Sequence, residues 1–381
     1  MIIRKVKVWQ YSIPLRTPLI TAQGTIAKRH GLIVRAETND GLIGYGEIAP
    51  LEGFSRENLE ETRRAVSSLQ QRLEGQPIPH GQSALRASYV GRGGDRVSLP
   101  SIPFGIETML ADLAAQIAGI NLARWFSPQA SNRVPVNAIL SGSMAEIKEQ
   151  LSRMLPCRYQ AYKLKVGVET DGFELEKIAY LRNTLGESIS IRLDANRVFG
   201  FDQAVRFIAS VAQFRIEYIE EPLRADQYNR LGDLRAESHV PIALDESLSD
   251  HRIGKATWCL RDRALQLADR GAMDVVVIKP MLAGGFCEVI ELVRDLSRSD
   301  FKMVISSAIE TGVGLVAALH LAAALGNTVL PCGLDTLGLL ADSLINEPLR
   351  VENGCISVPT EGGLGVTICD LNTNPHCSSV K

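Results

Sequence analysis

The second part of this chain alternates short apolar runs with helix-like stretches, and this alternation constrains the fold more than any other feature. Parallel strands need long crossover connections, usually helices, so the pattern predicts parallel strands joined by helices. Eight such units over roughly 220 residues predict an α/β fold, a TIM-like (β/α)7β barrel. The expected strands are 134–138, 161–166, 189–193, 218–220, 242–244, 275–278, 303–306 and 328–330, and the expected helices between them include 174–185, 201–214 and 287–296.

An open, doubly wound parallel sheet would show the same alternation. Such sheets commonly bind a dinucleotide through a Gly-x-Gly-x-x-Gly turn after an early strand. No such turn follows an early strand here, which favours the barrel.

The first part of the chain reads differently and predicts a separate α+β capping domain over residues 1–128. Three strands are expected there, with Asn39-Asp40-Gly41 as the turn before the third. The barrel would then occupy residues 129–345, and the segment 346–381 is expected to return to the capping domain. The expected elements of the capping domain are strands 4–15, 31–38 and 42–48 and helices 55–73 and 106–118, with a loop at 76–100.

Composition excludes several classes of partner. The formal net charge is -2, so no nucleic acid and no anionic membrane is expected as a partner. The longest apolar stretch, 313–325, is too short to cross a bilayer. The seven cysteines include no Cys-x-x-Cys pair and are typical of reduced thiols. We therefore expect a cytoplasmic protein that acts on a small molecule.

A pair of lysines ends the second expected barrel strand. Side chains alternate faces along a strand, so Lys163 and Lys165 point the same way. Mutual repulsion and burial both favour the neutral amine, which a general base needs near pH 7. On its own a Lys-x-Lys pair is usually solvated charge. Its importance therefore depends on the residues that follow it.

Three carboxylates and a further lysine end the next strands. Asp194, Glu220 and Asp245 are each about one strand–helix unit apart, and Lys279 follows the sixth strand. An aspartate after a strand is often only a helix cap, but charges on consecutive strand ends of a barrel would meet at one point. Carboxylates without a nearby histidine suit Mg²⁺ or Mn²⁺. The pattern predicts metal-assisted removal of a proton α to a carboxylate.

These residues resemble the enolase superfamily over nearly the whole chain. Tyr162-Lys163-Leu164-Lys165 is similar to its second-strand motif, and the segments 192–196, 219–222, 244–247 and 278–280 are similar to its third to sixth strands. The motifs are shared by muconate cycloisomerases, dipeptide epimerases, N-acylamino acid racemases and o-succinylbenzoate synthases. Narrower similarities favour the synthases and lie at 46–55, Arg192, 306–311 and 333–336. The sequence separation between Asp245 and Lys279 is longer than one strand–helix unit. It therefore departs from the regular spacing of the other charged residues at the strand ends.

The resemblance implies a role for each residue. It implies that Asp194, Glu220 and Asp245 bind Mg²⁺, or Mn²⁺ in its place. Lys165 would be the base, with Lys163 depressing its pKa, and Lys279 would stabilise the anion. The residues implied to bind the small carboxylate substrate are Arg192, Asn196, Ser306 and Ser307.

The implied reaction is the syn-dehydration of a cyclohexadiene carboxylate to 2-succinylbenzoate in menaquinone or phylloquinone biosynthesis. The alternatives are an N-acylamino acid racemase or dipeptide epimerase and, from another class, a non-catalytic barrel that only binds a metabolite. Loops 17–25 and 47–55 are expected to close over the barrel mouth and exclude water.

Overall fold

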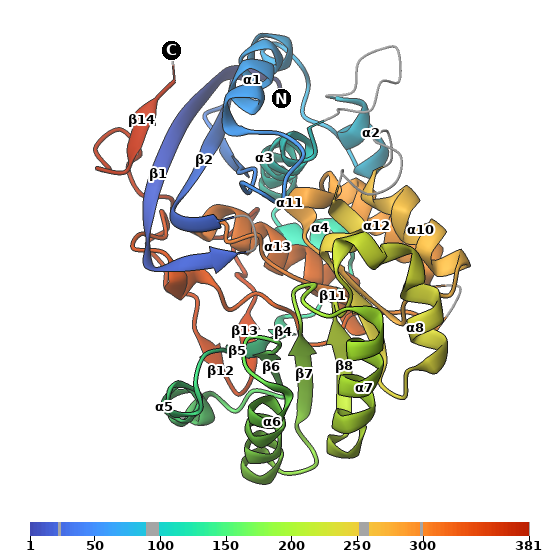
Figure 1. The fold of residues 1–381 in the computed structure, drawn as a ribbon. Helices are drawn as coiled ribbons and strands as arrows, with labels where there is room; N and C mark the ends of the chain where they lie inside the picture. The colour runs from blue at the N-terminus through green and yellow to red at the C-terminus, as the bar shows by residue number, and fades with distance from the viewer. Residues whose placement is uncertain (22–23, 89–98, 251–258, 298–299, 381) are drawn as a thin grey trace.

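The molecule has two parts, a ring of parallel strands wrapped in helices and an antiparallel sheet placed over one end of it (Figure 1). The computed structural model describes residues 1–21, 24–88, 99–250, 259–297 and 300–380. The expected fold class, a TIM-like α/β barrel with an α+β capping domain, is confirmed.

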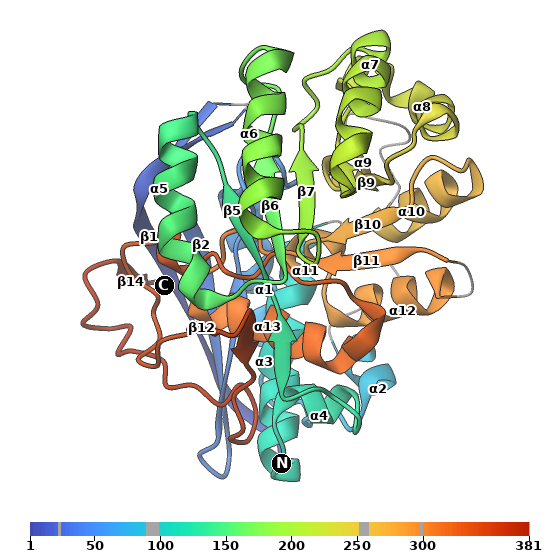
Figure 2. The ribbon, with the colours of Figure 1, turned by 90° about the horizontal axis from the view of Figure 1, so that it is seen from below.

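The parallel sheet has seven strands, and each pairs with its neighbours in sequence order. Helices follow the strands and lie outside them, as Figure 2 shows for α5, α6, α7 and α12. The strands are β5 (Asn137–Leu140), β6 (Ala161–Lys165), β7 (Ser190–Asp194), β8 (Ile216–Glu220), β9 (Ile242–Leu244), β10 (Val275–Ile278) and β11 (Lys302–Ile305). The helices are α5 (Met144–Met154), α6 (Asp171–Leu185), α7 (Phe201–Val211), α8 (Leu231–Glu237), α9 (Glu246–Ser249), α10 (Leu260–Asp269), α11 (Pro280–Ala283), α12 (Phe286–Leu296) and α13 (Gly312–Leu325).

The expectation of an eighth barrel strand at 328–330 is wrong, because no regular strand forms there. Residues 326–328 form a 3-10 turn, and the segment that follows makes only isolated bridges to β11 and to Val136. The Leu330 amide donates to the Met303 carbonyl at 2.7 Å, and the Cys332 amide donates to the Pro135 carbonyl at 2.7 Å. Pro331 has no amide hydrogen, so a continuous ladder cannot form here. The segment nevertheless bridges the two outer strands and closes the barrel.

The first expected barrel strand is divided in two. Arg133–Pro135 forms β4, which belongs to a small antiparallel sheet with β12 (Val351–Glu352) and β13 (Cys355–Ser357), and the barrel strand begins only at Asn137. We expected the whole segment from 346 onward to return to the capping domain, but β12 and β13 pair with β4 instead. Further along, Leu364 donates its amide to Asp112 in the cap, and β14 (Cys377–Ser379) pairs with β1.

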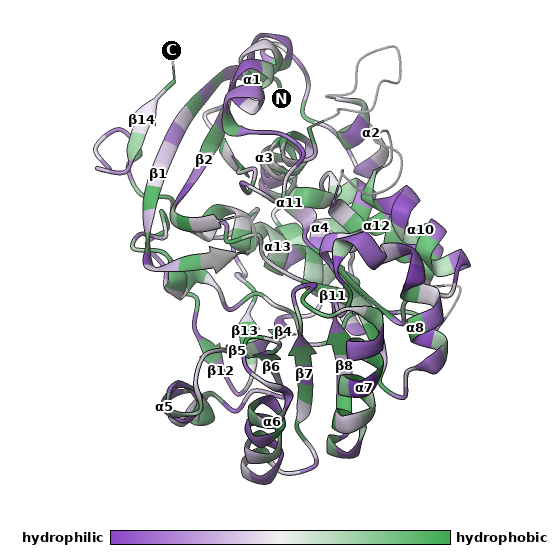
Figure 3. Cartoon of the chain, in the orientation of Figure 1, coloured by the Kyte–Doolittle hydropathy of each residue, from purple (hydrophilic) through white to green (hydrophobic). Residues whose placement is uncertain are grey.

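The barrel interior is filled by side chains from alternate strand positions. Tyr218, Ala243, Val275, Val277 and Val304 form a buried cluster inside the ring. The other side of each strand packs on the helices, so parallel strands are apolar on both faces. Figure 3 shows β7 and β8 mostly green, while α6 carries purple residues.

The capping sheet is built on one long hairpin. Its strands are β1 (Ile3–Thr21), β2 (Gly24–Thr38) and β3 (Ile43–Ile48), in the order β14-β1-β2-β3. The hairpin strands reach well beyond the expected ranges 4–15 and 31–38. A Cβ at Gly46 would lie 1.9 Å from the Gly105 carbonyl oxygen, so glycine is needed where β3 meets helix α3.

Among the described residues, four helices complete the capping part, and all four differ from expectation: α3 begins at Ser101 rather than near 106, and α4 was not expected. Helix α1 begins at Leu59 rather than near Ser55, because Asn58 and Glu61 form a reciprocal capping box. Helix α2 lies within the stretch that was expected to be a loop. The helices are α1 (Leu59–Leu73), α2 (Gln82–Ala87), α3 (Ser101–Ala118) and α4 (Leu122–Phe126). In the part of the chain that the structure describes, no helix combines the length and the apolarity that crossing a bilayer demands.

Candidate active site

The predicted charged residues meet at one end of the barrel. Asp194 and Glu220 are the last residues of β7 and β8 and are register partners, and Lys165 ends β6 opposite Asp194. Asp245 directly follows β9, and Lys279 directly follows β10. The C-terminal ends of parallel strands share one edge, so the barrel brings the predicted metal ligands and lysines together.

Lys163 is ion-paired with two of the carboxylates. Its Nζ lies 3.1 Å from both carboxylate oxygens of Glu220 and 3.6 Å from Oδ2 of Asp194. Burial alone would lower the pKa of Lys163, but the attraction of Glu220 and Asp194 outweighs it and raises the pKa well above its usual value. Lys163 therefore faces two carboxylates, whose attraction the expected repulsion between the two lysines did not take into account. The neighbouring strands supply counter-charges that the local sequence does not reveal.

Lys279 and Asp245 form a second buried pair. The Lys279 ammonium group donates to Oδ2 of Asp245. Burial lowers the pKa of Lys279, but Asp245 and Glu246 together raise it above its usual value. Lys279 is thus held as a cation at the barrel mouth, on the far side of the ring from β6.

The residues at these strand ends fit a divalent cation in their chemistry. Among the described residues, no three histidine, cysteine or acidic side chains are gathered as they would be around a bound ion. Ammonium groups of Lys163 and Lys279 lie against the carboxylates. The donor set of Asp194, Glu220 and Asp245 is nevertheless buried and made of oxygen alone, which suits Mg²⁺ or Mn²⁺. Oε2 of the adjacent Glu246 is buried without a hydrogen-bond partner in the structure.

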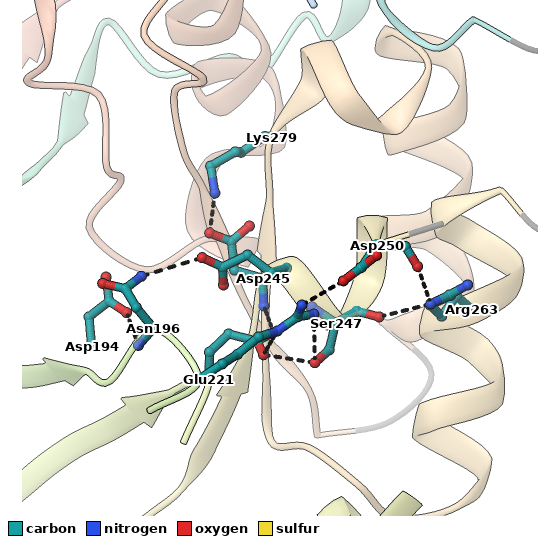
Figure 4. A network of polar contacts seen from close by, with 10 residues as sticks. Asp194, Asn196, Glu221, Asp245, Ser247, Asp250, Arg263 and Lys279 are labelled. Atoms are coloured by element: carbon teal, nitrogen blue, oxygen red, sulfur yellow. Dashed lines mark hydrogen bonds and ion pairs between the residues drawn. The ribbon is translucent and has the colours of Figure 1, made fainter. Parts of the chain in front are cut away.

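A buried network behind the carboxylates holds the end of β9 in place (Figure 4). Oε1 of Glu221 accepts from the amides of Asp245 and Ser247 at 2.8 and 2.7 Å, and Oε2 accepts from the Ser247 hydroxyl at 2.7 Å. Arg197 donates to Glu221 at 3.0 Å and to Asp250 at 2.8 Å. Glu221 therefore orients the backbone that carries Asp245.

Strained backbone follows two of the carboxylates. Asn196, Arg197 and Glu221 have φ values of 42°, 64° and 44°, a left-handed region that costs energy for residues other than glycine. Asn196 lies beside Asp194, whose Oδ1 accepts from the Asn196 amide at 3.2 Å, and its side chain donates to Glu246 at 3.3 Å. Such strain persists only where surrounding contacts enforce it, and it is concentrated here just after the strand ends.

Arg192 lies inside the barrel, below the strand ends. It is fully buried, stacks on Tyr218 at 5.0 Å and donates to Glu217 at 2.5 Å. It also donates to Asn137 at 3.0 Å and to the Pro331 carbonyl at 2.6 Å. Glu217 and Asn137 belong to the beginnings of their strands, so the guanidinium points away from the barrel mouth. These contacts give Arg192 a packing role rather than the expected contact with substrate.

The two expected serines have different surroundings. The Ser307 hydroxyl donates to Glu310 at 2.5 Å and accepts from the Ile309 amide at 2.8 Å and from Thr336 at 2.9 Å. A hydroxyl has one donor and two acceptor sites, so Ser307 has no capacity left for a substrate. Ser306 follows β11 directly and retains a small exposed fraction of 9%.

Sequence reasoning missed the contacts that join the cap to the barrel. Glu47, at the end of β3, accepts from Tyr11 at 2.6 Å, from the Thr311 amide at 3.0 Å and from the Gly314 amide at 2.8 Å. Arg29 donates to the Ile309 carbonyl at 3.1 Å. Arg29 lies between Lys28 and His30 in a basic run of β2, and no local pattern distinguishes it from an exposed strand arginine.

Comparison with known proteins agrees with this geometry. Residues 146–371 match the family model described as "Enolase C-terminal domain-like", and residues 3–113 match "MenC, N-terminal domain". An o-succinylbenzoate synthase from Pectobacterium atrosepticum is 30% identical over 350 residues, covering 90% of this chain and 93% of that protein. A hydrophobic dipeptide epimerase from Enterococcus faecalis is 28% identical over 331 residues, covering 86% and 88% respectively.

Solved structures of known enzymes have the same fold as this chain. The crystal structure of the dipeptide epimerase from Enterococcus faecalis, complexed with Mg and the dipeptide L-Leu-L-Tyr, has a TM-score of 0.83 at 25% identity and covers 96% of this chain and 100% of that one. Solved members of this family bind Mg²⁺ and small carboxylate compounds. The capped barrel and the matching family model together show that this chain is an enzyme of the enolase superfamily, in the subgroup that contains the muconate lactonizing enzymes.

Proposed function

We propose that this enzyme is an o-succinylbenzoate synthase of menaquinone or phylloquinone biosynthesis. It would dehydrate 2-succinyl-6-hydroxy-2,4-cyclohexadiene-1-carboxylate to 2-succinylbenzoate. The observation that carries the proposal is the match of the capping part, residues 3–113, to the domain described as "MenC, N-terminal domain". Epimerases and synthases of this subgroup share the chemistry at the strand ends, so the capping part is where they are expected to differ.

The residues that would hold the metal, together with Lys279, act on the carboxylate of the substrate. Asp194, Glu220 and Asp245 would hold Mg²⁺, which supplies positive charge where negative charge develops on that carboxylate. Lys279 is a buried cation directly after β10 and stabilises the same charge from across the ring. Glu221 keeps the Asp245 backbone oriented through its two amide contacts.

The proton is moved by Lys165. From the end of β6, its side chain takes the proton from the carbon that bears the carboxylate. The resulting ammonium then gives a proton to the hydroxyl group on the same face, which leaves as water. The ring becomes aromatic, and Lys165 returns to its starting state. Lys163 remains an ammonium bound to Glu220 and does not compete for the proton.

The rest of the substrate is expected to lie between the cap and the end of β11. Leu51 is buried and Phe54 packs against the core, so both could form an apolar wall for the ring. Ser306 would supply a hydrogen bond to the succinyl group. Exclusion of water matters because the anion formed after proton removal is easily reprotonated.

A dipeptide epimerase or N-acylamino acid racemase is the second candidate. Two observations favour it: the 28% identity to a hydrophobic dipeptide epimerase, and lysines at the ends of β6 and β10 that could act on opposite faces of an α-carbon. In that reaction Lys279 would have to exchange a proton. Its pairing with Asp245 and its raised pKa are better suited to a fixed cation.

A side-by-side turnover assay tests the proposal. The purified enzyme with Mg²⁺ is given the cyclohexadiene substrate, N-acylamino acids and dipeptides at matched concentrations. We expect kcat/KM of at least about 10⁴ M⁻¹s⁻¹ for dehydration, the lower end of the usual range for enzymes. A lower value for dehydration together with a higher one for any epimerisation would replace the synthase with the second candidate.

A further inference from the structure

The segment that follows β11 contains a residue in an unfavourable conformation. Ile309 has φ 62°, and a β-branched side chain at positive φ is strained because its Cβ crowds the backbone. Ile309 is also almost completely buried. Such a conformation persists only when neighbouring groups enforce it.

Both backbone polar groups of Ile309 are bound. Its amide donates to the Ser307 hydroxyl at 2.8 Å, within the same segment. Its carbonyl accepts from Nε of Arg29 at 3.1 Å, and Arg29 belongs to β2 of the cap. One of the two contacts that hold the strained residue therefore comes from the other part of the molecule.

Arg29 uses its guanidinium group on backbone carbonyls. Besides Ile309, it donates to the carbonyls of His30 at 2.9 Å and Pro50 at 2.7 Å, and to that of Ala49. The side chain is only 2% exposed. A planar fork of donors can hold several carbonyls at once, which a lysine ammonium cannot reproduce in the same geometry. Arg29 thus ties the loop after β3 to the segment after β11.

Glu47 also joins the loop after β3 to the segment after β11. It accepts from the Thr311 and Gly314 amides at the beginning of α13 and from the Tyr11 hydroxyl. Ile48 and Leu51, which follow it, are buried. The first half of the loop 47–55, expected to be a movable lid, is therefore a fixed wall joined to the barrel.

We propose that Arg29 is a positioning residue for the substrate, acting through the strained Ile309 to hold the segment Ser306–Thr311 in its binding conformation. The cap would then shape part of the barrel's own binding surface in addition to covering it. The inference rests on the proposed function only in placing the substrate against Ser306. The conformation of the segment can be measured without any substrate.

The chain offers a matched control for Arg29. Arg182 also donates to backbone carbonyls, those of Phe214 at 3.0 Å, Gly186 at 2.6 Å, Ile189 at 2.8 Å and Arg215 at 3.1 Å. These carbonyls precede β7 and β8, at the end of the barrel opposite the mouth. Arg29→Met and Arg182→Met remove the same kind of interaction at the two ends.

The first experiment is amide hydrogen exchange on the full-length enzyme. In Arg29→Met, peptides that cover 306–311 should exchange at least about tenfold faster than in the wild type, because the segment opens locally when its outer contact is lost. In Arg182→Met these peptides should exchange at the wild-type rate. Unchanged exchange at 306–311 in Arg29→Met, or equal acceleration in both variants, would overturn the proposal.

The second experiment separates positioning from general damage. For the dehydration, Arg29→Met should raise KM at least about tenfold and lower kcat by less, whereas Arg182→Met should leave KM unchanged.

Ile309→Gly removes the strain and Ile309→Ala retains it, while both lose the side chain. The KM effect of Arg29→Met should therefore shrink in the Ile309→Gly background but not in the Ile309→Ala background. An equal effect in both backgrounds would show that Arg29 does not act through Ile309. If wild type does not catalyse the dehydration, the proposed function fails and the exchange experiment alone decides this inference.

Discussion

The two sides of the candidate site are held by different kinds of interaction. On the metal side, charged side chains of neighbouring strands pair directly, as Lys163 does with Glu220. On the cap side, Arg29 and Glu47 bind backbone groups of the segment after β11 that are 280 and 264 positions away in sequence. The charged residues at the strand ends are thus positioned by strand register, and the segment after β11 by the docking of two parts of the molecule.

Removal of the metal should have the largest effect, and only on the metal side. EDTA is expected to abolish turnover, because three buried carboxylates at the strand ends would lose their common counter-ion, and added Mg²⁺ should restore it. Binding of Mg²⁺ to the stripped enzyme, followed by calorimetry, should be weakened by Asp245→Asn. Full activity after exhaustive chelation would contradict the assignment of these carboxylates.

Replacement of Lys165, the lysine at the end of β6, should have the next largest effect. Lys165→Ala should lower turnover at least about 10³-fold, on the scale expected for a general base. It should also stop exchange of the substrate α-proton with deuterated water. The control is Lys302→Ala, an exposed lysine at the opposite end of the barrel, which should leave both measurements unchanged. Turnover of Lys165→Ala within tenfold of the wild type would remove Lys165 from the mechanism.

A substitution on the cap side should affect stability more than chemistry. Glu47→Ala leaves the Thr311 and Gly314 amides and the Tyr11 hydroxyl buried without their acceptor. The free energy of unfolding should fall by about 2–4 kcal/mol, since each orphaned group carries a desolvation cost. Urea unfolding measures this. The exposed Glu149→Ala, which breaks only a surface pair with Arg153, should change little. Equal effects of the two substitutions would mean that Glu47 does not hold the cap.

The smallest effect concerns a buried carboxylate within the cap. Asp112 accepts from the Tyr45 and Leu364 amides at 2.9 Å, and burial raises its pKa to about 6. Its folded-state pKa lies above the unfolded value, so its protonation favours the fold at low pH, and this contribution is lost as the pH rises through 6. Stability should change by about 1.4 kcal/mol per pH unit between roughly pH 4 and pH 6. Asp112→Asn should remove that slope in unfolding experiments, and an unchanged slope would assign it to other groups.

Much of the fold could be predicted because its signals are local. The apolar runs located the seven barrel strands within a few residues, and α3 ends at Ala118 as expected, with Gly119 after it in a left-handed conformation. The errors came from competing local chemistry. Asn58 outcompeted Ser55 as the helix cap, and Pro331 prevented a regular eighth strand.

The candidate site could be predicted only in part. Strand ends carry their side chains to one edge of a barrel, so the positions of Asp194, Glu220 and Asp245 followed from spacing alone. The hydrogen-bond partners of Ser307 and Arg192 could not be predicted from spacing, because these partners lie on other strands and loops. Ser307 looked available in sequence, but Glu310, Ile309 and Thr336 use its whole hydrogen-bonding capacity.

By itself, the sequence determined the order of the strands and the ring of charges at their ends, because both follow from periodicity along the chain. Only the tertiary structure decided the pairing of Lys163 with two carboxylates, the inward position of Arg192 and the strain at Ile309. Each of these depends on groups brought close by folding: two carboxylates from adjacent strands, a carbonyl that closes the barrel, and an arginine from the cap. Electrostatic and hydrogen-bond energies depend on distance in space, and distance along the chain does not report it.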